Sequence, residues 1–465
     1  MIDSFAEYLH DLKFEDIPGE AVQKAKLCML DNFALMAVGC RSEAARAARR
    51  YLQRTCGGER ETPDLWFLPA REMAWFGGVA CFAYNMSDTS LHSVSHSGTV
   101  VFPTIFSLLR DHAALSGKEL IVLTVAGYDL IENPARIVNG GMKGQQRGFR
   151  PTPLCGVFGS AGIVARVRGY SRELTKKALA LAAHLGVGLR GTNGMLEAET
   201  GVPVQAIWFH SGYGARSGFE AADLAESGFF EYPTVMSEPG GFFLAFSDER
   251  DLDLLSRMSH FNTILDCRFK EYPVSHTLIP AIAAAKEVRR QLLAASRDPG
   301  DIRRITVRVP RAHYHIASRV PFPPNDTLAA QLSYPFVTAA TLLQGNFGIG
   351  EFLHYRRMPD AVRRLAERVD VRTDDELDRH FQQGKWPCSL EAEVNGKQYR
   401  HLVLDPHADR AEHRPEQEMV LEKVKGILSM VMRTDEANEI CDMILNLENE
   451  ANSGRLLEKL RQAVQ

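Results

Sequence analysis

The chain of 465 residues lacks any long apolar run, and this absence argues against a membrane protein. Nowhere do about eighteen apolar residues follow one another, so no membrane-spanning helix is expected. The N-terminus, MIDSFAEYLHDLKFEDIPGE, is acidic and amphipathic, without the basic start and apolar stretch of a signal peptide. We therefore expect a cytoplasmic protein with no membrane partner.

A surplus of positive charge is also missing. Lys and Arg number 54 against 58 for Asp and Glu, which gives a formal net charge of −4. Without a basic excess, binding to nucleic acid is not expected. The cysteines are few and scattered, and none belongs to a CxxC pair; they stand at positions 28, 40, 56, 81, 155, 267, 388 and 441. This pattern favours reduced core cysteines over disulfides or a zinc site.

Several common catalytic motifs are absent as well. There is no GxGxxG after a strand, no Walker loop, no HExxH and no GxSxG in a nucleophile-elbow context. His92 and His96 are four residues apart, as two metal ligands on a helix would be. The serines between and around them, followed by Gly98, argue against a helix there, and no third ligand is evident. We expect neither a metal nor a cofactor.

What the chain does contain is mostly helical patterning. Residues 20–39 are apolar at nearly every turn, as in a helix buried on all sides. Similar stretches, many rich in Ala and Gly, follow at 75–86, 103–115, 118–131, 154–168, 173–188 and 213–226. Residues 1–265 therefore predict one large helical domain. At this length a second domain is the default expectation.

The composition changes near Cys267. Residues 301–310 alternate in a β-like pattern, 326–343 are helical in pattern, and 369–373 and 389–394 are typical of strands. The pair Asn395-Gly396 is a strong hairpin signal. After Pro406 the chain is charged and then returns to amphipathic helices. We predict a mainly α protein in which residues 1–265 and 408–465 form the helical domain and 266–407 an inserted α+β lid.

Two segments concentrate chemically useful side chains. Residues 81–103 place a carboxylate, two imidazoles and an amide between apolar runs, and residues 147–152 bring a basic cluster to the start of an Ala/Gly-rich helix. Such a loop is costly to bury and unnecessary for folding. Loops held by rigid elements are where binding and catalysis concentrate.

These segments, with others in the same order along nearly the whole chain, carry a resemblance to the MmgE/PrpD family. Residues 5–31 match F…L…IP…A…K…LD, 85–98 a degraded DxDDT…HP-G, 148–161 GFH-P-T…G-x-G-A-A, 210–222 H-x-G-x-A-x-x-G-x-x-A-A, 270–276 K-x-(Y/F)-P…H, and 321–345 PFP…T…AQ-x-S…A…L-x-G. The resemblance implies a helical domain built from both termini and an inserted α+β lid. It also implies proton transfer or elimination next to a carboxylate of a small di- or tricarboxylic acid.

Three departures fall within the motifs of the implied active site. Asn85 stands where the family has Asp, Arg150 where it has the His of GFH, and Ile207 where a lysine usually lies. A guanidinium stays protonated, so Arg150 is not a base. It is suited instead to a bidentate contact with a carboxylate, sulfate or phosphate.

The resemblance, together with the residue chemistry, gives a set of candidates. As catalytic groups we name Asp88, His96 and His276. As substrate-binding residues we name Asn85, Thr89, His92, Arg150, Thr152, Lys270 and Tyr272. Structural alternatives stay open: Asp88 as a loop or helix cap, His96 as a satisfied structural histidine, and His92 as an ordinary loop residue.

The predicted function is that of a cofactor-independent lyase or isomerase acting on a small anionic substrate. The reaction would be an elimination or an intramolecular cyclisation in a specialised biosynthetic pathway. The alternative is a catalytically inactive partner or scaffold protein with the same fold. A homodimer, or a complex with a related chain, is expected. Convergence of Asp88, His96, Arg150 and His276 on one cavity would favour the enzyme.

Overall fold

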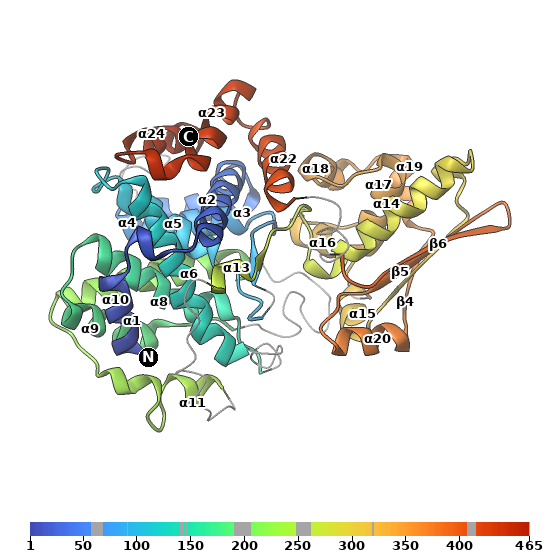
Figure 1. The fold of residues 1–465 in the computed structure, drawn as a ribbon. Helices are drawn as coiled ribbons and strands as arrows, with labels where there is room; N and C mark the ends of the chain where they lie inside the picture. Colours follow the sequence, from blue (N-terminus) through green and yellow to red (C-terminus); the bar gives the residue numbers. More distant parts are fainter. Residues whose placement is uncertain are drawn as a thin grey trace.

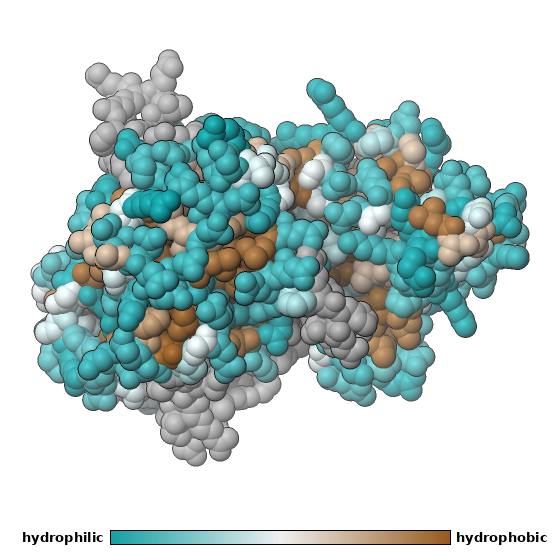
Figure 2. Space-filling view, turned by 45° about the horizontal axis from the view of Figure 1, so that its top comes forward, coloured by the Kyte–Doolittle hydropathy of each residue, from teal (hydrophilic) through white to brown (hydrophobic). Residues whose placement is uncertain are grey.

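The computed structural model describes residues 1–56, 68–90, 92–139, 144, 147–189, 206–247, 262–318, 320–406 and 415–464. Figure 1 shows a larger helical part and a smaller part that carries the main sheet. In Figure 2 hydrophilic residues cover most of the visible face, and hydrophobic residues gather in patches among them. Within the described residues, no helix has the length and apolar character needed to cross a membrane.

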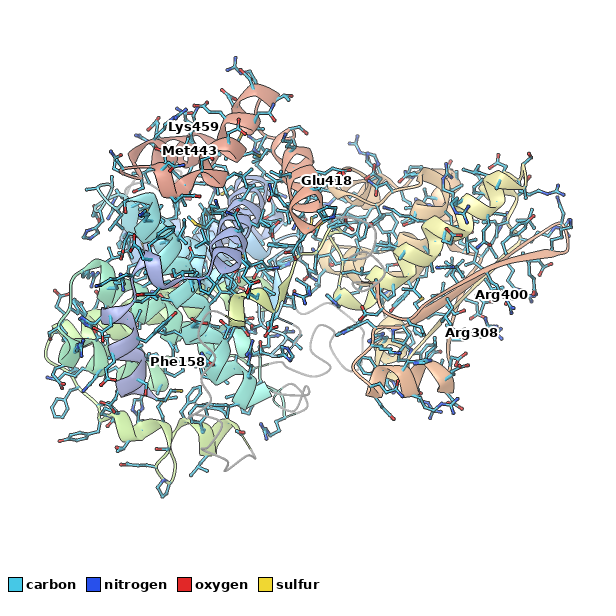
Figure 3. The ribbon with its side chains drawn as sticks, in the orientation of Figure 1. Phe158, Arg308, Arg400, Glu418, Met443 and Lys459 are labelled. Carbon is cyan, nitrogen blue, oxygen red and sulfur yellow. The ribbon has the colours of Figure 1, made fainter. Side chains whose placement is uncertain are left out.

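The helical part has the predicted succession of helices, but the stretch predicted at 103–115 is the helix Gly98–Leu109, and the helices predicted at 118–131 and 213–226 are longer than predicted. Its helices are α1 (Ile2–Asp11), α2 (Gly19–Gly39), α3 (Glu43–Cys56), α4 (Ala70–Phe82), α5 (Gly98–Leu109), α6 (Gly117–Asn139), α8 (Pro151–Val167), α9 (Arg172–Leu185) and α10 (Ala206–Glu226), followed by the short α11 (Phe242–Phe246) and α13 (Asn262–Leu265). Helix α8 packs against α5, α6, α9 and α10. Its Phe158 is fully buried among them (Figure 3).

Small residues let these helices approach closely. A Cβ added to Gly78 of α4 would lie 2.7 Å from the Cα of Gly212 on α10, so neither position has room for a side chain. The helix predicted at 75–86 is α4, which ends earlier, at Phe82. It ends there because the chain turns into the polar loop, where Asn85 has a positive φ of 53°.

The smaller part is the α+β unit. Its sheet has the order β4-β3-β5-β6, with β3 (Arg304–Val309) parallel to β4 (Val369–Thr373) and antiparallel to β5 (Cys388–Val394), and with β6 (Lys397–Val403) antiparallel to β5. Helix α14 (Ile279–Ala294) packs on β5 and β6, and α17 (Tyr334–Gln344) packs on α14 and β4. Arg308 and Arg400 lie on the opposite face of the sheet (Figure 3). We call this part the lid.

The lid also contains α15 (Arg311–Ala317), α16 (Thr327–Leu332), α18 (Ile349–Leu353), α19 (Asp360–Ala366) and α20 (Asp375–Gln382). The single helix predicted over 326–343 was wrong in one respect, since the chain breaks it into α16 and α17. The break lies at Ser333, whose extended backbone and side chain cap α17 by accepting from the Phe336 N–H. Pro335 follows in the first turn of α17, where it needs no hydrogen-bond donor.

The last helices are α22 (Glu416–Leu428), α23 (Thr434–Leu445) and α24 (Gly454–Val464). Each of them packs against α2 near the start of the chain. Figure 1 shows α22 between the helical part and the lid. We keep 1–265 with 408–465, and 266–407, as the proposed division of the chain.

Candidate active site

The polar loop that follows α4 is held against the start of the lid. Its strand β1 (Thr89–Ser90) pairs antiparallel with β2 (Cys267–Arg268). This pairing brings Lys270 to the loop, where Nζ donates to Oδ1 of Asn85 at 2.6 Å and lies 3.4 Å from the Val274 carbonyl oxygen. The left-handed backbone of Asn85 is one that asparagine tolerates better than most residues.

Asp88 is an anchor of this loop. Its carboxylate is fully buried and accepts from Asn32 Nδ2 at 3.1 Å, from the Tyr128 hydroxyl at 2.8 Å and from the Gly98 N–H at 3.4 Å. Because Gly98 begins α5, the contact matches the helix-cap alternative for Asp88. A catalytic role for this carboxylate stays a prediction.

His96 is oriented by the same loop. Its Nδ1 lies 3.0 Å from the Asp88 carbonyl oxygen and 3.2 Å from the hydroxyls of Ser87 and Thr89. A carbonyl oxygen only accepts, so Nδ1 carries the proton and Nε2 has the free lone pair. Burial of the ring, together with the positive charges of Lys270 and Arg150, lowers the pKa of His96 to about 3. The imidazole is therefore neutral at physiological pH.

Lys270 is buried, with 1% of its surface exposed. Burial lowers its pKa to about 7, and repulsion from Lys423 acts in the same direction, while Asp88 and Asp31 oppose the shift. A neutral oxygen of Asn85, rather than a carboxylate, accepts its hydrogen bond. The amine can therefore exchange a proton near neutral pH.

An ion pair that we did not predict, between Lys423 and Asp31, acts electrostatically on Lys270. Lys423 of α22 is 2.5 Å from Asp31 of α2 and donates to the Met86 carbonyl oxygen at 2.8 Å. Burial raises the pKa of Asp31 to about 6, although the Lys423 charge opposes this. A sequence signal did exist, because a carboxylate within the apolar run 20–39 needs a partner.

The second predicted segment supplies the other side of the site. The main-chain N–H of His96 donates to Thr152 Oγ1 on α8 at 2.9 Å. Arg150 stands at the N-cap of α8, and its N–H donates to the Gly188 carbonyl oxygen at 2.8 Å. Burial and the Arg150 charge lower the pKa of His210 to about 4, so this guanidinium lies near both His210 and His96.

A buried carboxylate holds the serines of the loop. Glu132 of α6 accepts from Ser93 at 2.6 Å and from Ser97 at 2.5 Å, and Ser95 makes a third, short contact. Sequence reasoning missed Glu132, which lies one residue beyond the predicted helical stretch 118–131.

Three further predicted residues make contacts with other side chains. The His276 ring is 4.5 Å from that of Trp386 in the lid. His92 has 62% of its side chain exposed, with Nε2 3.6 Å from Asp266. The Tyr272 hydroxyl accepts from Lys286 at 2.9 Å.

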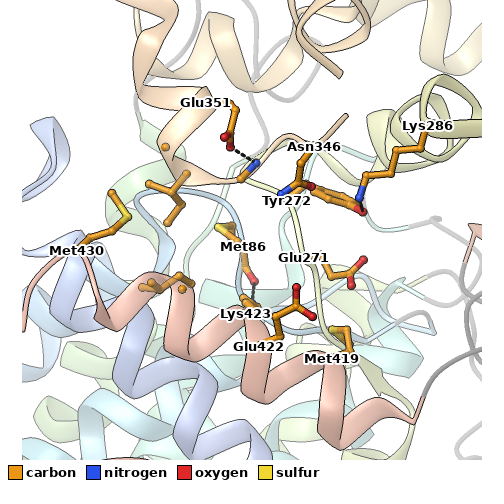
Figure 4. A pocket seen from close by; sticks show the side chains of 15 residues that line it. Met86, Glu271, Tyr272, Lys286, Asn346, Glu351, Met419, Glu422, Lys423 and Met430 are labelled. Carbon is orange, nitrogen blue, oxygen red and sulfur yellow. Dashed lines mark hydrogen bonds between the residues drawn. The ribbon is translucent and has the colours of Figure 1, made fainter. Parts of the chain in front are cut away.

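Tyr272 lines a cavity of about 430 Å³ between the lid and α22. Figure 4 shows Met86 and Lys423 on its other side, with Glu271 and Glu422 nearby. Among the candidate residues it is Tyr272 that lines this cavity. The structure thus gathers Asn85, Asp88, Thr89, His96, Thr152 and Lys270 into one hydrogen-bonded region with Arg150 near it. His276 contacts Trp386, Tyr272 lines the cavity and His92 is exposed.

Within the part of the chain that the structure describes, no three His, Cys, Asp or Glu side chains form a group that could hold a metal ion. The described cysteines are all free, and Cys56 alone among them is exposed.

A helical domain with an α+β lid, and a polar loop pinned between them, is the arrangement that the sequence motifs imply. The MmgE/PrpD N-terminal domain matches residues 3–255, and the MmgE/PrpD C-terminal domain matches residues 272–449. The chain belongs to the MmgE/PrpD family.

Curated relatives are similar over most of the chain. Human cis-aconitate decarboxylase is 28% identical over 386 residues, which cover 79% of this chain and 76% of that protein. The mouse protein of the same name is 26% identical over 384 residues, covering 79% and 75%. Cis-aconitate decarboxylase of Aspergillus terreus (strain NIH 2624) is 22% identical over 486 residues, covering 98% and 95%.

Proposed function

We propose that the protein is a cofactor-independent lyase or isomerase that acts on a small carboxylate substrate. The observation that carries the proposal is His96, whose Nδ1 is occupied by the Asp88 carbonyl oxygen so that Nε2 is left as a base. The positive charges of Lys270 and Arg150 lie near enough to the His96 ring to lower its pKa. Lys270, with a pKa of about 7, is matched to proton transfer near neutral pH, His96 offers a free lone pair at Nε2, and the Arg150 cation suits a substrate carboxylate. Relatives named cis-aconitate decarboxylase support a lyase that uses a carboxylate substrate.

The residues divide the work by their chemistry. Arg150 binds a substrate carboxylate through its planar fork of donors. His96 takes a proton from, or returns it to, the carbon next to that carboxylate. Lys270, with a pKa of about 7, donates to a developing oxyanion as ammonium or accepts a proton as amine.

Two of the departures from the family pattern, at Ile207 and Asn85, affect which reaction the site can catalyse. Ile207 is a buried alkyl side chain, and Asn85 is a neutral amide bound to Lys270. With these groups in place of an amine and an acid, we propose a substrate that differs from that of the named relatives. An elimination or an intramolecular cyclisation in a specialised biosynthetic pathway fits the remaining groups.

The test is a substrate screen with two readouts. The purified protein is incubated in D₂O with cis-aconitate and a panel of di- and tricarboxylates. Carbon–deuterium exchange or a new product is followed by NMR, and CO₂ release is measured in parallel. His96→Gln is the matched control, because it keeps a polar side chain but removes the base. We expect exchange or turnover with wild type and at most a hundredth of it with His96→Gln.

The second candidate is an inactive partner or scaffold protein, which the loss of three family side chains favours. Complete absence of exchange and turnover across the panel would support it and count against the enzyme. In either case we propose a dimer formed through the helical part. Phe229, Phe230 and Tyr232, which follow α10, are each more than half exposed and support this. Light scattering at micromolar concentration should give twice the chain mass of 51.8 kDa.

A further inference from the structure

Glu132 is a buried acid whose hydrogen-bond partners, among the described residues, come from the loop that carries His96. Its carboxylate is fully buried on α6. Ser93 donates to Oε2 at 2.6 Å, while Ser97, at 2.5 Å, and Ser95 reach Oε1. Among the described residues no lysine, arginine or histidine forms an ion pair with it. Three neutral hydroxyls therefore replace the solvation of this acid.

Folding alone gives little reason for such an arrangement. A buried carboxylate without a cation is costly, and apolar side chains at these four positions would remove the desolvation cost. We therefore look for the role of the Glu132–serine contacts in the loop segment 93–97, which they hold in place. Ser95 and Ser97 both contact Glu132, whereas His96 between them contacts Thr152 of α8 and the Asp88 carbonyl oxygen.

The backbone conformation of the loop also indicates that the Glu132 contacts serve function rather than folding. Val94 has a positive φ of 58°, which is a true outlier for a β-branched residue. Such a conformation persists only where the surroundings fix it, and it tends to occur at functional sites. The serine contacts to Glu132 on both sides of Val94 supply that fixation.

We propose that Glu132 is a positioning residue for the reaction. It acts through Ser95 and Ser97, which hold the backbone on either side of His96. With this backbone fixed, the His96 N–H meets Thr152 and Nδ1 meets the Asp88 carbonyl oxygen. The inference rests on the proposed role of His96 as the proton-transfer group.

The first test is steady-state kinetics of Glu132→Gln on the substrate that the panel identifies. The amide replaces one acceptor oxygen by an NH2 donor, so the arrangement of three donating hydroxyls on two oxygens is lost and the loop no longer holds His96 in one orientation. We expect kcat to fall roughly tenfold or more, with KM within about twofold of wild type. Ser97→Ala should lower kcat less, and adding it to Glu132→Gln should cause little further loss. If Glu132→Gln does not fold, the fall in kcat of Ser97→Ala tests the proposal in its place.

Asp129 supplies the matched control. It lies one turn earlier on α6, is also fully buried, and accepts from the Tyr8 hydroxyl at 2.6 Å. Asp129→Asn should cost stability in a similar way yet leave the kcat of the folded protein near that of wild type. An equal fall in kcat for Asp129→Asn and Glu132→Gln would reduce Glu132 to a general stabilising residue and overturn the proposal.

The second test does not need turnover. Diethyl pyrocarbonate acylates neutral imidazoles, and peptide mass spectrometry gives the rate at His96 itself. We expect a severalfold faster reaction at His96 in Glu132→Gln, because the freed ring becomes more accessible. The exposed His184 of α9, which lies outside this loop, serves as an internal standard with an unchanged rate. An unchanged rate at His96 overturns the positioning role. A changed rate in a protein with no turnover on the panel overturns the proposed function alone.

Discussion

Asn85 is the residue through which this chain changes the chemistry of its site most directly. Its Oδ1 is the nearest described acceptor for Lys270 Nζ, at 2.6 Å, and it carries no charge. An ammonium buried without a close counter-ion loses its proton more easily. Burial is the main cause that lowers the pKa of Lys270 to about 7, and the uncharged amide does not offset it as a carboxylate would.

Asn85→Asp should reverse this effect. A carboxylate beside Nζ raises the pKa of Lys270, and aspartate tolerates the left-handed backbone of this position. If the neutral amine is required, kcat/KM in wild type rises with pH through about 7. In Asn85→Asp this rise should move to higher pH, so activity at pH 7 falls. A pH–rate profile that is the same in both proteins would contradict a titrating role for Lys270.

The lowered pKa of Lys270 also predicts how stability depends on pH. Between about 7 and 10.5 the unfolded chain keeps a proton on Lys270 that the folded chain has lost. Stability therefore rises with pH across this window through this group. Lys270→Met should flatten the slope, as urea unfolding at several pH values would show. A slope unchanged by Lys270→Met would mean that the folded lysine keeps its ordinary pKa.

Arg150 should act in binding and not in proton transfer. A bidentate, charge-assisted contact contributes about 1.5–3 kcal/mol, so Arg150→Ala should raise KM or Kd for a carboxylate roughly ten- to hundredfold. Arg150→Lys should recover part of this, since lysine lacks the planar fork. Isothermal titration with the carboxylate that the panel identifies measures the effect. Unchanged affinity in Arg150→Ala would place Arg150 outside the substrate site.

Among the secondary-structure elements, those set by local sequence could be predicted well. The Asn395-Gly396 turn has positive φ at both residues, and it joins β5 to β6 with Val394 opposite Lys397. The apolar run 20–39 is α2, buried along nearly its whole length. Pairing of distant segments could not be predicted. Thr89 lies opposite Arg268 through the pairing of β1 with β2, and no local pattern encodes a contact between segments so far apart.

The same limit applies to the aromatic cluster of the lid. His313 of α15 stacks on Trp386 at 5.4 Å with 19° between the ring planes, and it lies 4.8 Å from Phe381 of α20. Its side chain is 2% exposed, and neither ring nitrogen has a hydrogen-bond partner among the described residues. Burial lowers the pKa of His313 to about 3, so the ring is neutral. Residues so far apart in sequence gave no sign of this packing.

His313→Phe should stabilise the lid. Phenylalanine keeps the aromatic packing and removes two unpaired polar atoms, whose burial costs about 1–3 kcal/mol. Urea unfolding should show a gain of roughly 1 kcal/mol, part of the benefit being lost to imperfect fit of the larger ring. His315→Phe, at an exposed position of the same helix, should change stability little. A loss of stability in His313→Phe would mean that its nitrogens have a partner in solution.

For the molecule as a whole, the chain order places the lid between two portions of one helical body. Helix α22 follows the lid in sequence, packs against α2, and contributes Met419, Glu422 and Lys423 to the cavity beside the lid. The composition predicted the switch to helices after Pro406. It did not predict that one of these helices would bring a charge to Asp31, since that contact spans nearly the whole chain.

The ion pair between Lys423 and Asp31 should couple this arrangement to both stability and activity. Removing one partner of a buried pair leaves an uncompensated charge, so Lys423→Met should cost about 3–5 kcal/mol in urea unfolding. Asp31→Leu combined with Lys423→Met should recover most of the loss. Lys425→Met, on the exposed side of α22, is the control and should stay within about 0.5 kcal/mol of wild type.

Lys423→Met should also raise the pKa of Lys270 in the site, because the Lys423 charge helps to lower it. In the folded variant the pH–rate profile should shift to higher pH, in the same direction as for Asn85→Asp. A Lys423→Met protein that matches Lys425→Met in stability would show that α22 is not anchored on α2 through this pair. The proposed return of the chain to the helical domain would then lose its main electrostatic support.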